Sequence, residues 1–511
     1  MSPAPSPAPR GFLERLTSAL QRRARHAWSR LTGDNAPLPI SVALDWLLEQ
    51  DTGHGLPARL GESKGCPGMT GACLGTVLNY GGRETAHRWA QWLLTVQRPD
   101  GAFADPADDR SFERTAWAVH GLRAVANDVP EAEAAIARAC EHLCARLDAE
   151  VLREPSDDED EDESPACLPH VIPLLEAGRH WANADWVMTA LGTADYCAAP
   201  GKAQGFYPFA SWMELVLQRD GIDAARREME PILACQKPDG SVRNEFGGSP
   251  VFGFESAYLA VFWYHLGWAE HADRTLAYLE QRVSTGGKFE LDGSWFAAAH
   301  GPQESPLAAK FYLDAAMLRV QAAFDATWQD FPDAIDPADG RMQAVGRWLA
   351  SLPEDARVAD VGCGRGRFLR SLRAEFPQSQ LTGIDISSAM LACLPEDIAA
   401  REGSLLRIPA ADGEFDGALA VESLEHALLP ERAVAELCRV VRPGGRVLII
   451  DKNLAKQPLS EYDPWERWFT PEELRGWLSR ACDAVTVRPV SHLEGRPGHD
   501  LFLAAEGVRR G

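Results

Sequence analysis

The chain has 511 residues, a length that exceeds one ordinary hydrophobic core and predicts two or three domains. It carries 51 Lys and Arg against 74 Asp and Glu, a formal net charge of -23, which argues against a nucleic-acid partner because phosphate contacts require a basic face. The 11 cysteines form no CxxC pair and follow no secretory signal, so we expect a cytoplasmic protein with reduced thiols and no metal site.

Residues 1–35 combine a Pro/Ser/Ala-rich arm with a basic amphipathic helix. The first nine residues, MSPAPSPAP, lack the apolar side chains of a core, and we expect them to be disordered. In the segment 10–33, leucines and alanines recur on one helical face and arginines flank it. Such a helix suits two places: the inner face of an anionic membrane, as a peripheral contact, or the acidic surface of the same protein.

Residues 36–320 have the pattern of successive helices without alternating strands. Two stretches repeat within them, WLLTVQRPDGAF at 92–103 and PILACQKPDGSV at 231–242. Proline presets one backbone dihedral and glycine accepts positive φ, so each repeat predicts a turn between two helices. Repeated helix-turn-helix units are typical of architectures in which each unit buries its apolar face against its neighbours. We expect the acidic segment 154–165 to be a solvated loop, because adjacent carboxylates repel one another.

The Gln-x-x-Asp-Gly text of these turns resembles the prenyltransferase and squalene-cyclase repeat superfamily. The resemblance implies that residues 36–320 form an all-α toroid, in which helices stack in two concentric rings. It implies no chemistry, since neither the Asp-x-Asp-Asp acid of a cyclase nor a set of zinc ligands stands in a matching context.

Beyond residue 320 the pattern changes to alternating strands and helices. Strands are expected at 357–361, 380–385, 415–421 and 446–451. This alternation predicts a Rossmann-like α/β domain with a mostly parallel sheet over residues 321–511. The ligands of such sheets bind beyond the carboxyl ends of the strands.

A glycine-rich loop stands at one such strand end, in RVADVGCGRGRFLRSL at 357–372. Gly362, Gly364 and Gly366 permit a tight turn that brings backbone N–H groups close to a ligand at the start of a helix. Dinucleotide enzymes and kinases use similar loops, so the glycines alone do not identify the ligand.

Three further features accompany the glycine loop. Asp385 closes the next predicted strand, 25 residues after Asp360. Pro-Gly-Gly at 443–445 predicts a turn that enters another strand, and the acidic text ESLEH at 422–426 follows a third. This ordered set resembles the class I S-adenosylmethionine-dependent methyltransferases, which implies S-adenosylmethionine as cofactor and methyl transfer as activity.

The same resemblance implies roles for single residues. Asp360 would orient the glycine loop and approach the methionine part of the cofactor, while Asp385 would bind the ribose. Ser404 stands where many relatives have an Asp that reaches the adenine amino group, and a hydroxyl can still form a hydrogen bond there. The cofactor-binding residues are then Asp360, Gly362, Gly364, Gly366, Asp385, Ile386, Ser404 and Leu405.

His426, just beyond the fourth predicted strand, is the candidate general base. Its ordinary pKa of about 6.5 suits proton acceptance near neutrality, although the same residue could simply pack at a helix start. Glu422 and Glu425 would hold the acceptor or orient His426. The aromatic residues Trp465, Trp468 and Phe469 either stack on the acceptor or support the helix start that follows them.

The acceptor is the open question. A toroid joined to a methyltransferase suggests oxygen methylation of a carbohydrate or glycolipid, as in surface-polysaccharide assembly. The alternatives are an isoprenoid or other small natural product, and a toroid that only docks a partner for the methyltransferase. The sequence assigns no oligomeric state.

Overall fold

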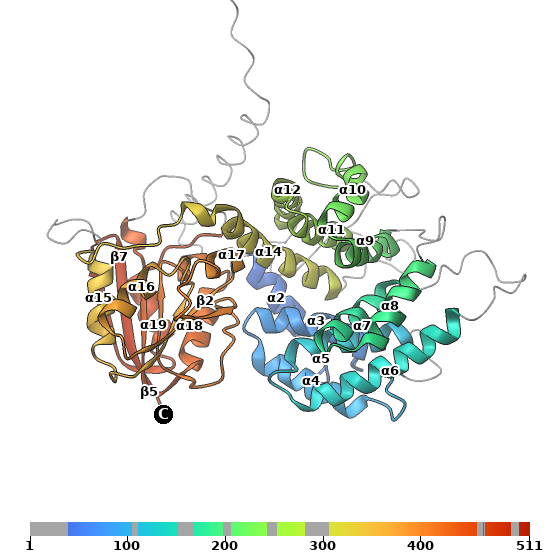
Figure 1. The fold of residues 1–511 in the computed structure, drawn as a ribbon, viewed down its shortest axis with the longest axis horizontal. Coiled ribbons are helices and arrows are strands. Elements are labelled where there is room, and N and C mark those ends of the chain that lie inside the picture. Colours follow the sequence, from blue (N-terminus) through green and yellow to red (C-terminus); the bar gives the residue numbers. More distant parts are fainter. Residues whose placement is uncertain are drawn as a thin grey trace, which may run out of the picture.

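The computed structural model describes residues 39–104, 111–151, 168–197, 206–242, 253–281, 306–456, 463, 465–491 and 500–511. The expectations for residues 1–35 and for the acidic segment 154–165 lie outside these ranges. Two parts lie side by side, one helical and one with a sheet (Figure 1). None of the helices in the described ranges has both the length and the apolar character of a membrane-crossing segment.

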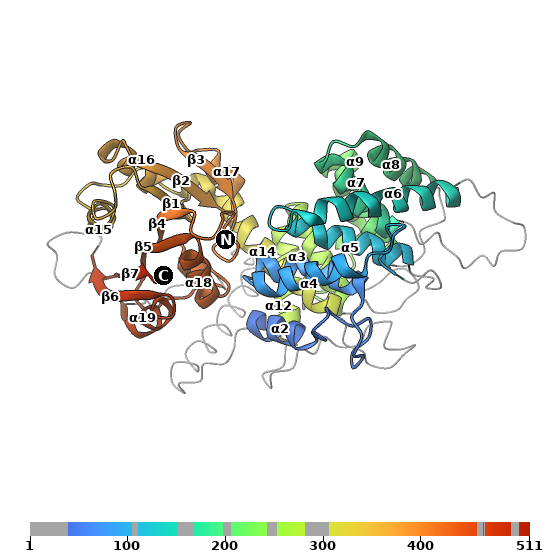
Figure 2. The ribbon, with the colours of Figure 1, turned by 90° about the horizontal axis from the view of Figure 1, so that it is seen from below.

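The helical part contains two sets of helices that alternate along the chain. They are α2 (Pro39–Glu49), α3 (Pro67–Asn79), α4 (Arg83–Val96), α5 (Ser111–Val125), α6 (Glu131–Val151), α7 (Leu168–His180), α8 (Ala184–Cys197), α9 (Phe206–Asp220), α10 (Ile222–Leu233), α11 (Gly253–His265), α12 (Ala269–Glu280) and α14 (Pro306–Thr327). α3 packs on α5, α5 on α7, α7 on α9, α9 on α11 and α11 on α14, and α14 contacts α3 again. The other helices pack against members of this series, as Figure 2 shows for α4 beside α5.

The two repeated turns have the same geometry. Gly101 and Gly240 each have a φ of 90°, and an added Cβ would lie 2.2 Å from the carbonyl oxygen of Arg138 in the first turn and 2.1 Å from that of Arg274 in the second. Only glycine combines this backbone conformation with such close packing.

The glutamine of each repeat fixes its turn to the next helix but one. The Nε2 of Gln97 donates to the carbonyl oxygen of Ala135 in α6 at 2.7 Å, and that of Gln236 donates to the carbonyl oxygen of His271 in α12 at 2.8 Å. Each repeat therefore joins a helix end to the helix that packs beside it.

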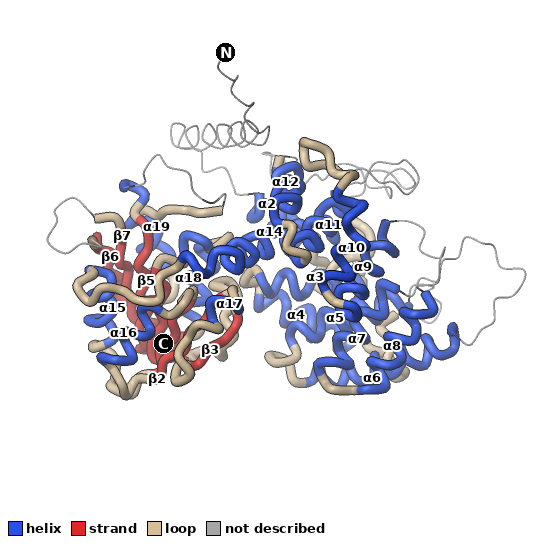
Figure 3. Tube along the Cα trace, turned by 45° about the horizontal axis from the view of Figure 1, so that its top comes forward, coloured by secondary structure: helices blue, strands red, loops and turns tan. Residues whose placement is uncertain are grey.

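The second part is a seven-stranded mixed sheet with the order β3-β2-β1-β4-β5-β7-β6. Its elements are η1 (Trp328–Asp330), α15 (Gly340–Leu349), β1 (Arg357–Val361), α16 (Arg367–Glu375), β2 (Gln380–Asp385), α17 (Ser388–Leu391), β3 (Ala399–Glu402), β4 (Phe415–Val421), η2 (Leu424–His426), α18 (Pro430–Arg439), β5 (Val441–Lys452), η3 (Leu454–Lys456), α19 (Pro471–Leu478), β6 (Cys482–Val490) and β7 (Phe502–Arg509). The first five strands in spatial order are parallel, and β7 runs antiparallel to both of its neighbours, β5 and β6. Figure 3 shows the strands gathered in the sheet part, beside the helical part. The prediction of a mostly parallel Rossmann-like sheet is confirmed.

One local expectation is wrong. Pro443, Gly444 and Gly445 do not precede the strand but lie within β5. The pairing of β4 with β5 shifts register between Phe415 and Gly417, and Gly444 has a φ of 76°. A bulge inside the strand accommodates the glycines, so the strand begins earlier than its apolar run.

Helix α14 belongs to both parts. Its residues pack on α2, α3, α11 and α12 of the helical part and on α17 beside the sheet. The domain boundary expected between residues 320 and 321 therefore falls inside a continuous helix. Buried apolar residues form one cluster that extends from the helical part to one face of the sheet, and a second cluster covers the other face with α15 and α16.

Candidate active site

A cavity of about 490 Å³ opens at the carboxyl ends of β1, β2 and β4. A cavity of this size is typical of small-molecule sites. Every residue proposed from the sequence for cofactor binding or catalysis lines this cavity, with the exception of Gly366. The strand topology thus brings together residues that are far apart in the sequence.

The glycine loop follows β1 and needs glycine for two different reasons. At Gly362, with a φ of 76°, an added Cβ would lie 2.3 Å from the Cβ of Ser423. Gly366, with a φ of 79°, begins α16, and its added Cβ would meet the Cδ2 of Leu394 at 2.3 Å. Gly366 therefore serves the turn and the packing below it, whereas Gly362 and Gly364 border the cavity.

Asp360 is a buried carboxyl group at the end of β1. It is 1% exposed, and its Oδ2 has no hydrogen-bond partner among the described residues. Burial raises the pKa of Asp360 to about 7, with a further contribution from Asp385 and an opposing one from Arg367. A buried acceptor without a donor fits a ligand that brings its own N–H groups, as the amino acid end of S-adenosylmethionine does.

Asp385 stands at the end of β2 and is fixed by backbone donors. The N–H of Gly364 donates to its Oδ2 at 2.8 Å, and the N–H of Ser387 donates to its Oδ1 at 2.9 Å. Burial raises the pKa of Asp385, and these backbone N–H groups act in the opposite direction. Each carboxylate oxygen retains capacity for another donor, so the group fits a pair of ribose hydroxyls.

Ser404 and Leu405 lie on the loop after β3 and line the cavity. The Oγ of Ser404 accepts hydrogen bonds from the backbone N–H groups of Leu406 and Arg407, both at 3.2 Å. Ser404 therefore stabilises its own turn with its oxygen and has only its hydroxyl hydrogen left for a ligand. Leu405 and Ile386 supply apolar surface suited to a flat ring.

Two arginines of the glycine loop also line the cavity, and the sequence reasoning missed them. Arg365 donates to the carbonyl oxygen of Phe331 at 2.8 Å, and Arg367 donates to Glu422 at 2.6 Å. Arg365 lies between two glycines of GCGRGR and Arg367 directly follows the last one, so the sequence alone could have indicated that both arginines lie at the site. Guanidinium groups at this place suit a ligand carboxylate.

Glu422 does not orient His426. It follows β4 with a φ of 53°, and its carboxylate is shared by Arg341 and Arg367. Arg341 also pairs with Asp339 at 2.6 Å. Of its two expected roles, orienting the base is wrong, because two arginines from other elements already hold this carboxylate; holding the acceptor stays a prediction.

His426 ends η2 and has one free ring nitrogen. Its Nε2 lies 3.3 Å from the Oε1 of Glu425, and its Nδ1 is buried without a partner among the described residues. The ring packs edge-on against Phe324 of α14, with centroids 5.0 Å apart. Burial lowers the pKa of His426, although Glu466 and Asp451 act in the opposite direction. Burial thus favours the neutral imidazole, which is the form that can accept a proton.

Glu425 is fixed by a cation that the sequence reasoning did not identify. It is 2% exposed, and the Nζ of Lys452 lies 3.0 Å from its Oε1. The same Nζ lies 3.0 Å from the Oε1 of Glu466, and burial raises the pKa of Glu425 to about 7 against the effect of Lys452. Lys452 ends β5 and Glu466 lies in a later loop, so only the fold shows that they meet at this site.

One group of side chains near the cavity has the composition of a metal site. The group contains His426, Asp463 and Glu466. Each offers one atom that could bind a metal ion, and these three atoms lie within 4.8 Å of one another. The ammonium group of Lys452 already supplies a positive charge to Glu466 there.

The aromatic residues 465, 468 and 469 do not line the cavity. Phe469 is fully buried and packs edge-on against Trp477. Thr470 and Glu473 form a capping box at the start of α19. Of the two expected roles, Phe469 therefore supports the start of the following helix and does not stack on the acceptor.

Comparisons with known proteins match part of this chain. Residues 359–449 match the family described as "Methyltransferase domain". The chain is 35% identical over 151 residues to an S-adenosyl-L-methionine-dependent Diels-Alderase of Talaromyces variabilis, covering 27% of this chain and 49% of the relative. It is 34% identical over 153 residues to a probable chloroplastic tocopherol O-methyltransferase of Oryza sativa, covering 27% and 40%.

A third relative is a ubiquinone biosynthesis O-methyltransferase of Alkalilimnicola ehrlichii, 29% identical over 169 residues, with 28% of this chain and 66% of the relative covered. The chain thus spans between two fifths and two thirds of these relatives. Among solved structures, a possible histamine N-methyltransferase of Thermotoga maritima is 22% identical, with 34% of this chain and 88% of that chain covered and a TM-score of 0.28.

The family match, over residues 359–449, includes the glycine loop, Asp360 and Asp385. The buried acceptor of Asp360, the backbone-held Asp385 and the apolar lining fit S-adenosylmethionine as cofactor. Residues 359–449 are thus a methyltransferase domain, and the relatives support a class I S-adenosylmethionine-dependent methyltransferase in this C-terminal region of the chain.

Proposed function

We propose that the protein transfers a methyl group from S-adenosylmethionine to a hydroxyl group of a small, largely apolar acceptor. The observation that carries this proposal is the position of His426: it lines the same cavity as the cofactor residues and the apolar side chains Met317, Val320 and Phe324. A proton acceptor between a methyl donor and an apolar pocket suits the methylation of such a hydroxyl.

The cofactor supplies a methyl group on a positively charged sulfur, which is already activated for transfer. Asp360 would accept hydrogen bonds from the ammonium group of the cofactor, and Arg365 and Arg367 would attract its carboxylate. Asp385 would accept hydrogen bonds from the ribose hydroxyls, and Ile386 and Leu405 would exclude water from the adenine. These residues hold the donor in place, so that alignment with the acceptor makes the main contribution to rate.

His426 removes the proton from the acceptor hydroxyl as the methyl group is transferred. The Nε2 of the ring lies 3.3 Å from the Oε1 of Glu425, and a proton held on Nε2 beside this carboxylate leaves the lone pair on Nδ1. Lys452 keeps the Glu425 carboxylate in position. The structure-based role of Glu425 is thus a positioning one.

The apolar lining favours a ring or isoprenoid acceptor over the carbohydrate expected first. Sugar hydroxyls facing apolar side chains would lose their hydrogen bonds to water without replacement. Two of the relatives are named for tocopherol and ubiquinone biosynthesis, both of which point to a hydroxylated ring with an apolar tail. A prenylated hydroquinone is therefore the first acceptor to test.

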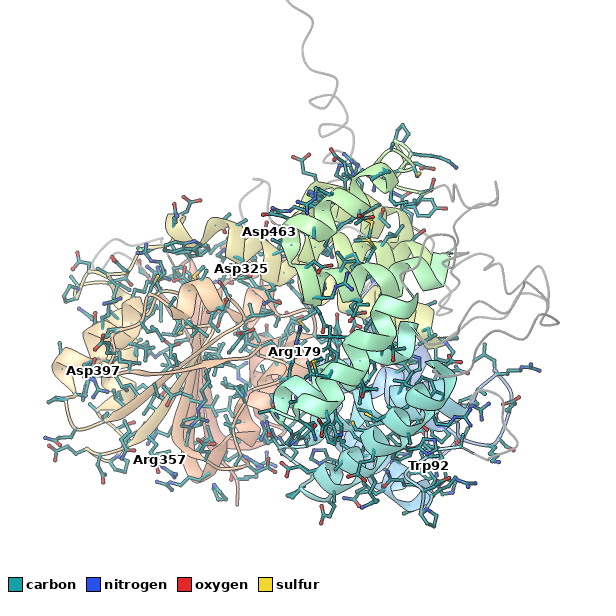
Figure 4. All side chains as sticks on the ribbon, turned by 45° about the vertical axis from the view of Figure 1, so that its right-hand side comes forward. Trp92, Arg179, Asp325, Arg357, Asp397 and Asp463 are labelled. Atoms are coloured by element: carbon teal, nitrogen blue, oxygen red, sulfur yellow. The ribbon has the colours of Figure 1, made fainter. Side chains whose placement is uncertain are left out.

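The test separates cofactor binding from methyl transfer. We expect the wild type to bind S-adenosylhomocysteine in a calorimetric titration and Asp385→Ala to lose this binding, while Asp397→Asn, on the outer edge of the sheet part, retains it (Figure 4). Methyl transfer to prenylated hydroquinones is then measured beside methyl glycosides. Wild type that binds no cofactor, or that methylates only glycosides, would contradict the proposal.

We also infer that the helical part closes as an α/α toroid. Its support is the closed series of contacts from α3 through α5, α7, α9 and α11 to α14 and back to α3. The repeated turns at Gly101 and Gly240, with their equivalent hydrogen bonds, fit a ring of similar units.

A further inference from the structure

Helix α14 is firmly anchored in the helical part along its first half. Phe311 stacks on Tyr258 of α11 with centroids 4.1 Å apart, and Asp314 accepts a hydrogen bond from Thr76 of α3 at 2.8 Å. The hydroxyl of Tyr80 donates to the carbonyl oxygen of Leu313 at 2.7 Å. These contacts fix the direction in which the helix leaves the helical core.

The last turns of the same helix form a wall of the cavity. Met317, Val320 and Phe324 line it, and their spacing of three and four residues places them on one helical face. All three are apolar. Phe324 is also the residue that packs edge-on against His426, so this face lies beside the proposed base.

The apolar surface continues from α14 to the neighbouring segments. Phe331 packs near Phe324 with ring centroids 5.9 Å apart, and Ala427 and Leu428 line the cavity directly after His426. The charged residues of the cavity that bind the donor, among them Asp360 and Arg365, come instead from the glycine loop and its strand. The cavity therefore has a polar end for the donor and an apolar end at α14, and the base itself also has Glu425 and Lys452 beside it.

The wall is held in place on the sheet side as well. Asp325 of α14 accepts a hydrogen bond from the Oγ of Ser387 at 2.5 Å, and Figure 4 shows Asp325 where α14 meets the sheet part. Farther along the interface, Arg407 donates to the Oδ1 of Asn79 at 2.8 Å and to the carbonyl oxygen of Ala124 at 2.7 Å. The helical part thus meets the methyltransferase domain through polar contacts at Asp325 in α14 and at Arg407 farther along the interface.

We propose that the Met317, Val320 and Phe324 face of α14 selects the acceptor, so that the helical part completes the acceptor site and excludes polyhydroxylated acceptors. This inference rests on the proposed function, since it assigns the acceptor to the apolar end of the same cavity. An apolar ring or chain packs against this face without losing hydrogen bonds, whereas a sugar leaves hydroxyls unpaired there.

The experiment compares polar substitutions of matched size on two faces of α14 in the full-length protein. Met317→Gln places an amide in the wall, and Leu318→Gln makes the same kind of change at a neighbouring residue that packs on the core and does not line the cavity. The measurements are the calorimetric Kd of S-adenosylhomocysteine and the KM for a prenylated hydroquinone.

We expect Met317→Gln to raise the KM for the prenylated hydroquinone about tenfold or more while the Kd of S-adenosylhomocysteine stays within about twofold. Leu318→Gln should leave KM unchanged. An unchanged KM in both Met317→Gln and Val320→Thr would overturn the role of α14, as would a wild type that methylates glycosides at a higher kcat/KM than hydroquinones. Failure of the wild type to bind S-adenosylhomocysteine would refute the proposed function itself.

Discussion

At the scale of single residues, the position of His426 in the cavity carries the catalytic proposal. We expect His426→Asn to lower kcat by a factor of about 100 to 10,000, because a positioned general base typically contributes that much. Binding of S-adenosylhomocysteine should remain, since no cofactor group is assigned to this ring. The check is single-turnover transfer of a labelled methyl group; a variant with wild-type turnover would remove His426 from the mechanism.

The pairing of His426 with Glu425 predicts a pH dependence. Burial raises the pKa of Glu425 to about 7, so the carboxyl group takes up a proton as the pH falls through that value. A protonated Glu425 accepts the Nε2–H of His426 less well, and we expect kcat to decline on the acid side of about pH 7. Glu425→Gln should be slow at every pH and lack this decline. A wild-type kcat that is constant through neutrality would contradict the assignment.

Asp360 predicts a conflict between stability and cofactor binding. Folding raises the pKa of Asp360 from 3.8 to about 7. This shift corresponds to a loss of roughly 4 kcal/mol of stability above pH 7, where the carboxyl group is charged in both states. The loss disappears below the pKa of the unfolded chain, where the group is neutral in both states. We expect Asp360→Asn to raise the free energy of unfolding at pH 8 by about 1 to 2 kcal/mol, less than the full amount because the amide is also buried. The gain should vanish near pH 4.

The measurement is urea unfolding at both pH values, with calorimetry for the cofactor. Asp360→Asn should weaken S-adenosylhomocysteine binding, because it replaces the buried acceptor. Asp397→Asn, whose side chain is 61% exposed beside Arg373, is the control and should change neither quantity. A less stable Asp360→Asn at pH 8 would show that the carboxylate is paired in the free protein.

At the scale of elements, the repeated turns make a symmetric prediction. Gly101→Ala and Gly240→Ala should each lower the free energy of unfolding by about 2 kcal/mol or more, because a Cβ at either position meets a carbonyl oxygen and strains a φ of 90°. Gly192→Ala, in α8, meets nothing within 4 Å and should be neutral or slightly stabilising. Chemical denaturation of the three variants checks this. Equal stability of all three would contradict the common geometry.

The elements also explain what could be read from the sequence. The glycine loop, Asp385 and the Gln-x-x-Asp-Gly turns were readable because each is a local pattern whose spacing sets its geometry. Lys452, Met317 and Val320 were not predicted, since Lys452 reaches the site through the sheet topology and the other two through a helix that continues from the helical part. The same reason accounts for Glu422, whose partner Arg341 lies 81 residues away in the sequence.

At the scale of the whole molecule, the two parts should respond together to the cofactor. A ligand stabilises every segment that must unfold before it dissociates, by about 2.7 kcal/mol at a concentration of 100 times Kd. We therefore expect saturating S-adenosylhomocysteine to slow hydrogen exchange in α3 and α5 as well as in β1 and β2. Arg407→Ala, which removes the contacts with Asn79 and Ala124, should weaken the effect in the helices only. Protection limited to the strands in the wild type would contradict this coupling.

The shared helix α14 also has a consequence for how such chains could diversify. The residues that pack the helical core and the residues that face the acceptor alternate along one continuous segment, from Pro306 to Thr327. A recombination event that replaced the helical part would replace the acceptor wall with it, and the donor site, encoded entirely downstream, would be left intact. Acceptor preference would then be inherited with the helical part, and the chemistry of methyl transfer with the rest of the gene.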